Sequence, residues 1–439
     1  MLKKFKNLKS KKVLNSLRKE GLLKDSFYMI FSNIYSKGAS YIFFFLMAYI
    51  LGTEGFGTLR GVLPILDSLV IFFCSGIPPA MAKFISEYKH DNKSHYNETS
   101  WIYGVLNVML IFSLIGGIFT IFLKYFLGGY YKNLDANIYY IIALTLPFSA
   151  FISWNRGVLQ GSLKIKELSK TWIAEHTSKI IFSIFLASLI GVMGGILSIS
   201  LGYIIGGLLG FYFIAKNNLI PKNKIRSFKL MVKNPMVKKV ILYSIPIALG
   251  TASYRLLSDL DSIFIMSILG PQLNGLYGYA SLLSRALFLF ASSISIPLIP
   301  RIAKTKDVNY FKKAILMNLG IVTPFLFMFL IFSKELLILF FNIDYYESSL
   351  SLKILSISAA FMGSYTICAA SLQGLGYAKV PLYVISFGVV LNAILNYILV
   401  KNIGIVGGAA ATLISSFFIF VITLYFTIEK LKVWQFHKK

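Results

Sequence analysis

The sequence alternates long apolar runs with short polar breaks. Twelve of the runs approach the roughly 20 mainly apolar residues that a helix needs to cross a membrane. A shorter apolar run, 336–343, predicts an interfacial piece of an outer loop rather than a span. The pattern therefore predicts an all-α polytopic membrane protein with twelve transmembrane helices. They are expected near residues 26–51, 61–84, 101–123, 138–160, 171–190, 195–215, 240–269, 277–300, 312–332, 350–374, 380–400 and 404–426.

Part of this pattern occurs twice. Residues 37–83 return 218 positions later, and a later stretch returns at an offset of 213. Because a charge inside an apolar run is costly, a repeat that preserves charged positions indicates duplication. Each half holds an even number of spans, so two parallel six-helix repeats around a central cleft are predicted. Equivalent positions include Lys37 and Arg255, Asp67 and Arg285, Gly57 and Gly275, and Gly191 and Gly404.

Lysine and arginine are distributed unevenly between alternate connections. One set carries 33 of the 44 basic residues and the other set carries 5, which is the positive-inside signature and predicts that both termini are cytoplasmic. The net charge of +27 is therefore explained by topology and attraction to anionic lipids, and no nucleic-acid partner is expected. The predicted organisation is a basic tail 1–25, a lobe 26–215, a linker 216–239, a second lobe 240–426 and a basic tail 427–439.

The composition supports a membrane protein and predicts no cofactor site. Hydrophobic residues make up 56% of the 439 and charged residues 14%, against about 25% charged residues in soluble domains. The two cysteines, Cys74 and Cys368, fall inside predicted spans and indicate neither a disulfide framework nor a metal site. The four histidines have no metal-ligand spacing, and no phosphate-cradling glycine motif occurs.

Several short motifs resemble one family of exporters. They are a glycine break at 51–57, Lys83 after the proline-bearing second span, and the Gln-Gly pairs 160–161 and 373–374. In this order they resemble the polysaccharide-biosynthesis, or O-antigen-repeat, flippases of the multidrug/oligosaccharidyl-lipid/polysaccharide (MOP) exporter superfamily. The resemblance implies a V-shaped bundle in the cell membrane that moves polyprenyl-pyrophosphate-linked glycans from the cytoplasmic to the outer leaflet by alternating access. The lack of a thirteenth and fourteenth span favours a surface glycan over a peptidoglycan precursor as cargo.

Lys37 and Arg255 are the predicted central cations of the cleft. Each lies near the middle of its span at an equivalent position of the repeat, where a cation can replace part of the hydration of a pyrophosphate. The alternative is that Arg255 pairs with Asp259, which lies one helical turn further on. Both readings hold if an arriving phosphate releases Arg255 from that pair.

Asp67 and Arg285 are predicted to close an outer gate. They occupy equivalent positions with opposite charge near the outer face, so an ion pair could join the two halves; local pairing of each residue is the alternative. Arg60 stands at the outer boundary and is expected to contact the emerging head group or to snorkel to the interface.

An inner mouth is predicted around Arg156, Glu175 and Lys179. Glu175 and Lys179 stand at the i, i+4 spacing that favours an ion pair within one helix. With Arg156 near the cytoplasmic end of the fourth span they could admit the pyrophosphate, whereas a purely structural pair is the alternative.

A coupling ion, Na⁺ or H⁺, is expected in the second half. Asp259 and Asp261 lie on one helix and point about 200° apart, so only one can face a given site. That carboxylate could join Asn392, Asn396 or Thr412 in an oxygen-rich cation site.

Two other functions remain open at this stage. A cation-coupled multidrug antiporter of the MATE type needs an acidic cleft. The seventh predicted span carries the carboxylates Asp259 and Asp261, which are compatible with such a cleft. A non-transporting scaffold for glycan-assembly enzymes is the second alternative. An enzyme is not expected, because the predicted outer loops carry no reactive constellation. The expected partners are a polyprenyl-linked glycan, membrane lipids and glycan-assembly enzymes.

Overall fold

The computed structural model describes residues 22–90, 100–127, 134–220, 232–305, 308–342, 345–377 and 379–436. These residues form helices and the turns between them, and no strand occurs among them. Most of the predicted N-terminal tail, the middle of the linker and the last three residues lie outside the described residues.

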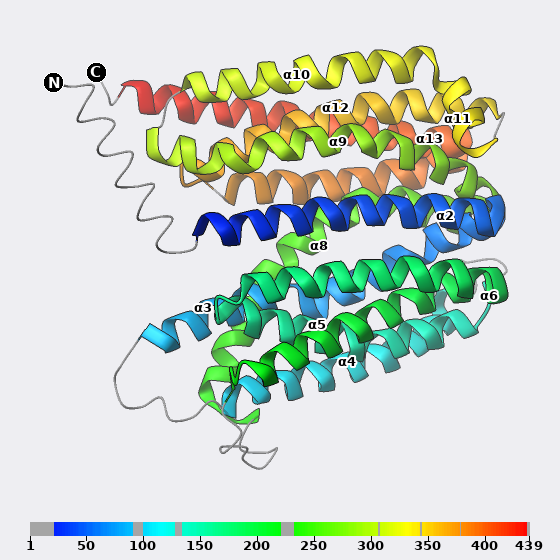
Figure 1. Ribbon diagram of the computed structural model, residues 1–439. Helices are drawn as coiled ribbons and strands as arrows, with labels where there is room; N and C mark the ends of the chain where they lie inside the picture. Colours follow the sequence, from blue (N-terminus) through cyan, green and yellow to red (C-terminus); the bar gives the residue numbers. More distant parts are fainter. Residues whose placement is uncertain are drawn as a thin grey trace. The chain divides into compact units, whose positions relative to one another are not determined.

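The helices follow one another in the order shown in Figure 1. Seven of those described are long and apolar enough to cross a membrane, and α8 and α9 add 35 residues each. Together they hold eleven of the predicted spans, whereas the predicted span 61–84 begins in the helix that ends at Val70 and continues through a π-helical turn into the next helix. Their bounds are α2 Leu22–Val70, the π-helical turn η1 Ile71–Ser75, α3 Ile77–His90, α4 Ser100–Leu127, α5 Asn137–Gly161, α6 Ile165–Lys216, α8 Pro235–Leu269, α9 Pro271–Thr305, α10 Val308–Ile331, α11 Ser333–Phe341, α12 Tyr346–Gly374 and α13 Lys379–Phe436.

Two of the longest helices, α6 and α13, each contain two predicted spans joined at a glycine. Gly191 has φ 59° and ψ −135°, and the residue before it has φ −129°. Gly404 has φ 63° and ψ −145°, and the residue before it has φ −130°. A positive φ is easily adopted only by glycine, so the same residue produces the same bend in both halves. The repeat predicted from the sequence is therefore present in the backbone.

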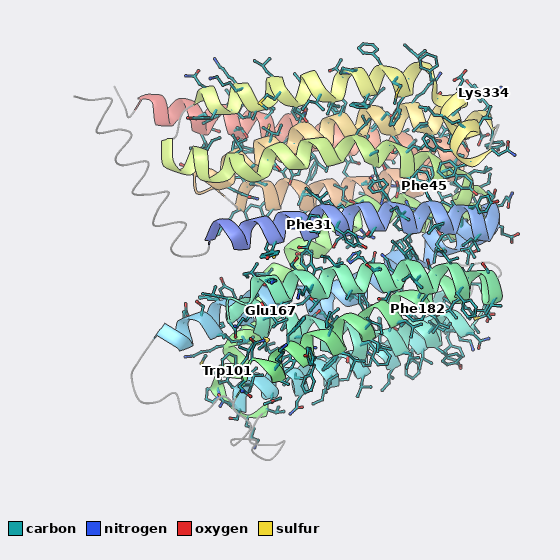
Figure 2. All side chains as sticks on the ribbon, in the orientation of Figure 1. Phe31, Phe45, Trp101, Glu167, Phe182 and Lys334 are labelled. Carbon is teal, nitrogen blue, oxygen red and sulfur yellow. The ribbon has the colours of Figure 1, made fainter. Side chains whose placement is uncertain are left out.

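The outer faces of the helices are apolar, as a lipid environment requires. On α4, Leu114, Ile118 and Phe122 are each more than half exposed, and Phe31 on α2 is 51% exposed (Figure 2). Soluble monomers rarely expose contiguous apolar surface of this extent. The exposed pattern agrees with the long apolar helices in describing a multi-pass membrane protein.

Contacts divide the chain into two compact units. The first comprises residues up to Leu46, Leu69–Ile121 and Asn137–Ala248, and the second comprises Met47–Ser68, Phe122–Ala136 and Leu249 to the end. The segment Met47–Ser68 thus packs with the second unit although it belongs to the first half of the sequence. The predicted lobes follow the sequence repeat. The compact units do not, because each of them contains segments from both halves of the sequence.

Glycines explain how the segment Met47–Ser68 joins the second unit. A Cβ on Gly57 would lie 1.8 Å from the carbonyl oxygen of Pro271, and a Cβ on Gly275 would lie 1.9 Å from that of Thr53. Both pairs are related by the 218-residue repeat, so the contact is reciprocal. Only a residue without Cβ allows two backbones to approach this closely.

Candidate functional site

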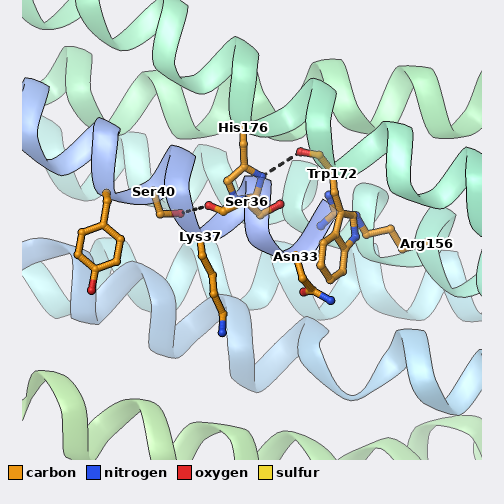
Figure 3. A pocket seen from close by; sticks show the side chains of 8 residues that line it. Asn33, Ser36, Lys37, Ser40, Arg156, Trp172 and His176 are labelled. Atoms are coloured by element: carbon orange, nitrogen blue, oxygen red, sulfur yellow. Dashed lines mark hydrogen bonds between the residues drawn. The ribbon is translucent and has the colours of Figure 1, made fainter. Parts of the chain in front are cut away.

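A polar cavity lies in the first unit between α2, α5 and α6. Its volume is about 340 Å³, and it brings together two cations that were predicted to serve different sites, Lys37 and Arg156 (Figure 3). We call it the α2–α5–α6 pocket. The side chains lining it are Asn33, Ser36, Lys37, Ser40 and Tyr41 of α2, Arg156 of α5, and Trp172 and His176 of α6.

The helical spacing explains why these residues converge. Asn33, Ser36, Lys37, Ser40 and Tyr41 follow an i, i+3, i+4 pattern, which places them on one face of α2. Trp172 and His176 are likewise one turn apart on α6. A polar stripe at helical spacing inside an apolar run was therefore the signal in the sequence, and Lys37 is the member of this stripe that was predicted as a site residue.

Arg156 is held in place by Glu175. The two side chains form an ion pair, with 17% and 10% of their surfaces exposed. Glu175 is buried where the two arms of α6 pack closely, since a Cβ on Gly202 would lie 3.0 Å from the Glu175 carbonyl oxygen. A buried carboxylate needs a cation, and Arg156 supplies it. The ammonium of Lys179 lies 4.7 Å from the centroid of the Phe43 ring, so its pairing with Glu175 stays a prediction.

Three buried polar atoms in the pocket have no hydrogen-bond partner among the described residues. They are Ser36 Oγ, Arg156 Nε and Trp172 Nε1. Other polar groups nearby are paired: His176 Nδ1 lies 3.0 Å from the Trp172 carbonyl oxygen, and the Arg156 guanidinium lies 5.4 Å from the Trp172 ring centroid. A buried donor without an acceptor is costly, and these three atoms are the unsatisfied polar groups of the side chains that line the pocket.

The second unit contains a network of charged residues from α2, α8 and α9. Arg255 forms an ion pair with Asp67, and its Nε lies 2.7 Å from Asp259 Oδ2. The Arg285 guanidinium lies 3.1 Å from Asp259 Oδ1 and also donates to the Ser258 carbonyl oxygen. The predicted Arg255–Asp259 pair is thus observed, and Asp259 connects two arginines.

The predicted outer gate takes a different form in these contacts. The ion pairs found for its two residues join Asp67 to Arg255 and Arg285 to Asp259, and both residues lie in the second unit. The reason is that Arg255 and Asp259 stand one turn apart on α8. Arg255 pairs with Asp67, and Asp259 pairs with Arg285. A gate between the halves stays a prediction.

Arg60 is buried and does not snorkel in this structure. It is 4% exposed, its Nη2 donates to Ser281 Oγ at 3.1 Å, and its carbonyl oxygen accepts a hydrogen bond from Ser262 Oγ at 3.2 Å. Contact with a head group stays a prediction for this residue.

The residues of the predicted coupling-ion site are linked by a second polar network. Asp261 accepts a hydrogen bond from the Tyr277 hydroxyl, which also bonds Thr412. Asn392 Nδ2 lies 3.5 Å from Thr412 Oγ1, and Asn396 Nδ2 donates to Asn392 Oδ1 at 3.0 Å. Asp259 faces the arginines and Asp261 faces Tyr277, as the helical angle predicted. Tyr277 was not identified from the sequence, because it follows Asp261 by 16 residues on another helix. Within the described residues, no group of three His, Cys, Asp or Glu side chains could hold a metal ion.

Comparison with known proteins gives the family. The family described as "Polysaccharide biosynthesis protein" matches residues 22–306, and the MatE family matches residues 246–398. The first match covers well over half of the chain. The chain belongs to the polysaccharide biosynthesis protein family. This family membership confirms the resemblance drawn from the glycine break and the Gln-Gly pairs.

Two relatives are similar to this family member over most of its length. An uncharacterized membrane protein of Methanocaldococcus jannaschii is 47% identical, and the match covers 92% of this chain and 97% of the relative. A probable low-salt glycan biosynthesis flippase of Haloferax volcanii is 24% identical over 90% of this chain and 81% of its own length.

Solved structures show the fold. The lipid II flippase MurJ in an inward closed conformation has a TM-score of 0.71 at 17% identity, covering 93% of this chain and 89% of MurJ. An inward-facing MATE family transporter of the MOP superfamily has a TM-score of 0.66 at 14% identity, and the match covers 89% of this chain and 94% of the transporter. The family member therefore has the all-α, multi-pass membrane fold that these transporters share.

Proposed function

We propose that this exporter flips a polyprenyl-pyrophosphate-linked oligosaccharide from the cytoplasmic to the outer leaflet of the cell membrane by alternating access. The observation that carries the proposal is the α2–α5–α6 pocket, where Lys37 and Arg156 stand beside buried hydrogen-bond donors. The family match supports an exporter of this class. The proposed role is transport without catalysis, with both termini in the cytoplasm.

Lys37 supplies the charge for binding. Inside a membrane protein a cation is expensive and is retained mostly for function. Lys37 lies in the predicted middle of a span and lines the pocket, so an anionic head group entering from the cytoplasm would meet a positive charge there. Arg156 is oriented by Glu175 and lines the same pocket.

Arg255 contributes to binding through exchange of partners. Its present partners are Asp67 and Asp259. A phosphate that competes with Asp67 for Arg255 would loosen the connection between α2 and α8, because the ion pair joins those helices. Binding and movement would then be coupled through one guanidinium.

The coupling ion is proposed to act at Asp261. The network from Asp261 through Tyr277 and Thr412 to Asn392 and Asn396 offers oxygen atoms for Na⁺ or a path for H⁺. Asn396 Oδ1 is buried without a hydrogen-bond partner among the described residues, so it has an oxygen to offer a cation.

A multidrug antiporter of the MATE type is the second candidate. It is supported by the MatE match to residues 246–398. An antiporter for organic cations would need carboxylates available to its substrate, whereas Asp67 and Asp259 are engaged by arginines. The flippase is therefore the better-supported function.

The test is leaflet-resolved translocation of a polyprenyl-pyrophosphate oligosaccharide in proteoliposomes. The Lys37→Ala variant should lose at least tenfold in rate while inserting normally into the membrane. Lys401→Ala removes an exposed lysine of α13 and should retain the rate. Normal translocation by Lys37→Ala would show that this pocket does not bind the anion.

A further inference from the structure

We propose that a groove between the two arms of α6 binds one chain of an anionic phospholipid, whose phosphate group contacts Lys170. The groove lies within the first compact unit, and no residue lines both it and the α2–α5–α6 pocket. The inference uses the proposed cytoplasmic position of the connection 162–170, and it does not depend on the transported cargo.

The groove follows one face of each arm, and we call it the α6 groove. Its volume is about 520 Å³, within the range of about 300–1,000 Å³ that is typical of ligand sites. On the first arm its lining runs from Lys170 to Ile181, and on the second arm it comprises Ile205, Leu209 and Phe213. Most of this lining is aliphatic or aromatic, so the groove suits an apolar ligand.

The α6 groove is open to its surroundings along its length. The two arms approach each other closely beside it, since a Cβ on Gly202 would lie 3.0 Å from the Glu175 carbonyl oxygen. On the groove side of this contact the side chains are accessible: Ile181 is 60% exposed and Ile205 is 39% exposed. A lipid chain can therefore enter from the bilayer without a rearrangement of the helices.

The hydroxyl groups of the groove are already satisfied within the protein. Thr177 Oγ1 donates to the Ile173 carbonyl oxygen at 2.8 Å and shares a hydrogen bond of 2.6 Å with the Tyr35 hydroxyl. Ser178 Oγ donates to the Ala174 carbonyl oxygen at 2.6 Å. Covering a polar group is costly only when it loses a hydrogen bond. The interior of the groove therefore fits a hydrocarbon chain better than a sugar or a free phosphate.

The length of the groove matches the depth of one leaflet. Lys170 and Ile181 are eleven residues apart, which corresponds to about 16 Å along a helix. One leaflet contributes about 15 Å to the hydrocarbon core of a bilayer. Figure 2 labels Glu167 and Phe182, which lie on α6 close to the two ends of this stretch. A phospholipid chain that begins at Lys170 thus ends near Ile181, whereas a longer polyprenyl chain would extend beyond the groove.

The end of the groove at Lys170 is positively charged. Lys170 is exposed, and its ammonium lies 5.7 Å from the centroid of the Phe213 ring on the other arm. Lys166 is also exposed and stands one turn earlier on the same face of the helix. With three lysines and one glutamate, the connection 162–170 carries a net charge of +2 however these residues pair. Basic residues at the cytoplasmic surface attract anionic lipids, so the head group of the bound lipid is negative.

The experiment measures photo-crosslinking of phospholipids to the full-length protein in phosphatidylcholine nanodiscs. Two probes carry the same photoactivatable acyl chain, one under a phosphatidylglycerol head group and one under a phosphatidylcholine head group. Mass spectrometry of peptides gives the labelling of the α6 groove relative to that of the exposed apolar face of α4. We expect the phosphatidylglycerol probe to label the groove about fivefold more strongly than the phosphatidylcholine probe, since one lysine near the surface has an effect of this size.

Two variants separate the head group from the chain. Lys170→Gln should lower groove labelling by the phosphatidylglycerol probe about fivefold and leave the phosphatidylcholine probe unchanged; Lys239→Gln, which removes an exposed lysine of α8 in the same unit, should change neither. Ala174→Leu narrows the groove and should lower labelling by both probes. Ala215→Leu, at an exposed position of α6 outside the groove, is its control.

Three outcomes would overturn the proposal. The first is equal labelling of the groove by the two probes, and the second is an effect of Lys170→Gln no larger than that of Lys239→Gln. The third is displacement of the probe by polyprenyl phosphate at a concentration about tenfold lower than unlabelled phosphatidylglycerol requires, which would assign the groove to the lipid carrier. Because no glycolipid is translocated in this assay, a failure of the flippase function leaves its result unchanged.

Discussion

The ion pair between Arg156 and Glu175 allows a quantitative test of how the pocket is held together. Removing one partner of a fully buried pair costs about 3–5 kcal/mol, whereas exposed pairs contribute about 0–1 kcal/mol. With side chains 17% and 10% exposed, the pair lies between these limits and closer to the buried one. Arg156→Met should therefore cost about 2–4 kcal/mol in free energy of unfolding, because Glu175 keeps a buried charge without its guanidinium.

A double-mutant cycle separates this charge effect from packing. Glu175→Gln should cost about 1–2 kcal/mol, since Arg156 borders the cavity and can be hydrated there. In the double variant no uncompensated carboxylate is left, so it should be at least about 1 kcal/mol more stable than Arg156→Met alone. The assay is reversible unfolding of the purified protein in mixed detergent micelles. Costs that simply add, or a cost of Arg156→Met below about 0.5 kcal/mol, would refute the reasoning.

Three further predictions concern the second unit. Gly57→Ala should destabilise the protein by about 1–3 kcal/mol, because its methyl group would meet the Pro271 carbonyl oxygen; Gly38→Ala, which has open space around it, is the control in the same unfolding assay, and equal stability of the two variants would contradict the close approach. Arg255→Ala should reduce glycolipid translocation at least tenfold with normal membrane insertion, and full activity would argue against its role in anion exchange. Tyr277→Phe should weaken the dependence of translocation on a Na⁺ or H⁺ gradient, while the exposed Tyr383→Phe should not; an unchanged gradient dependence would remove Tyr277 from the coupling path.

The spans and the repeat could be predicted from the sequence because both are written as local patterns. Apolar runs of sufficient length define the spans, and glycine at Gly191 and Gly404 fixes the same bend in each half through its positive φ. The Arg255–Asp259 pair was also predictable, since residues four apart on a helix share one face.

The exchange of segments between the compact units could not be predicted. The contact of Gly57 with Pro271 involves a backbone oxygen 214 positions away, and no side-chain pattern encodes it. The ion-pair partner of Glu175 could not be predicted either. The helical spacing indicated Lys179, whereas the ion pair found is with Arg156 on another helix.

The pocket residues were missed for a related reason. Trp172 and Ser36 are unremarkable in a membrane span taken alone, and their significance comes from lying in one cavity with buried donors. Only the polar stripe along α2 could have indicated them in advance.

The central claim is tested most directly by giving one proteoliposome preparation two substrates, a polyprenyl-pyrophosphate oligosaccharide and a cationic dye, under an imposed Na⁺ gradient. The account predicts that the glycolipid reaches the opposite leaflet and that the dye stays where it was added. Movement of the dye without movement of the glycolipid would contradict the flippase and identify a drug antiporter, with Asp259 and Asp261 as its centre.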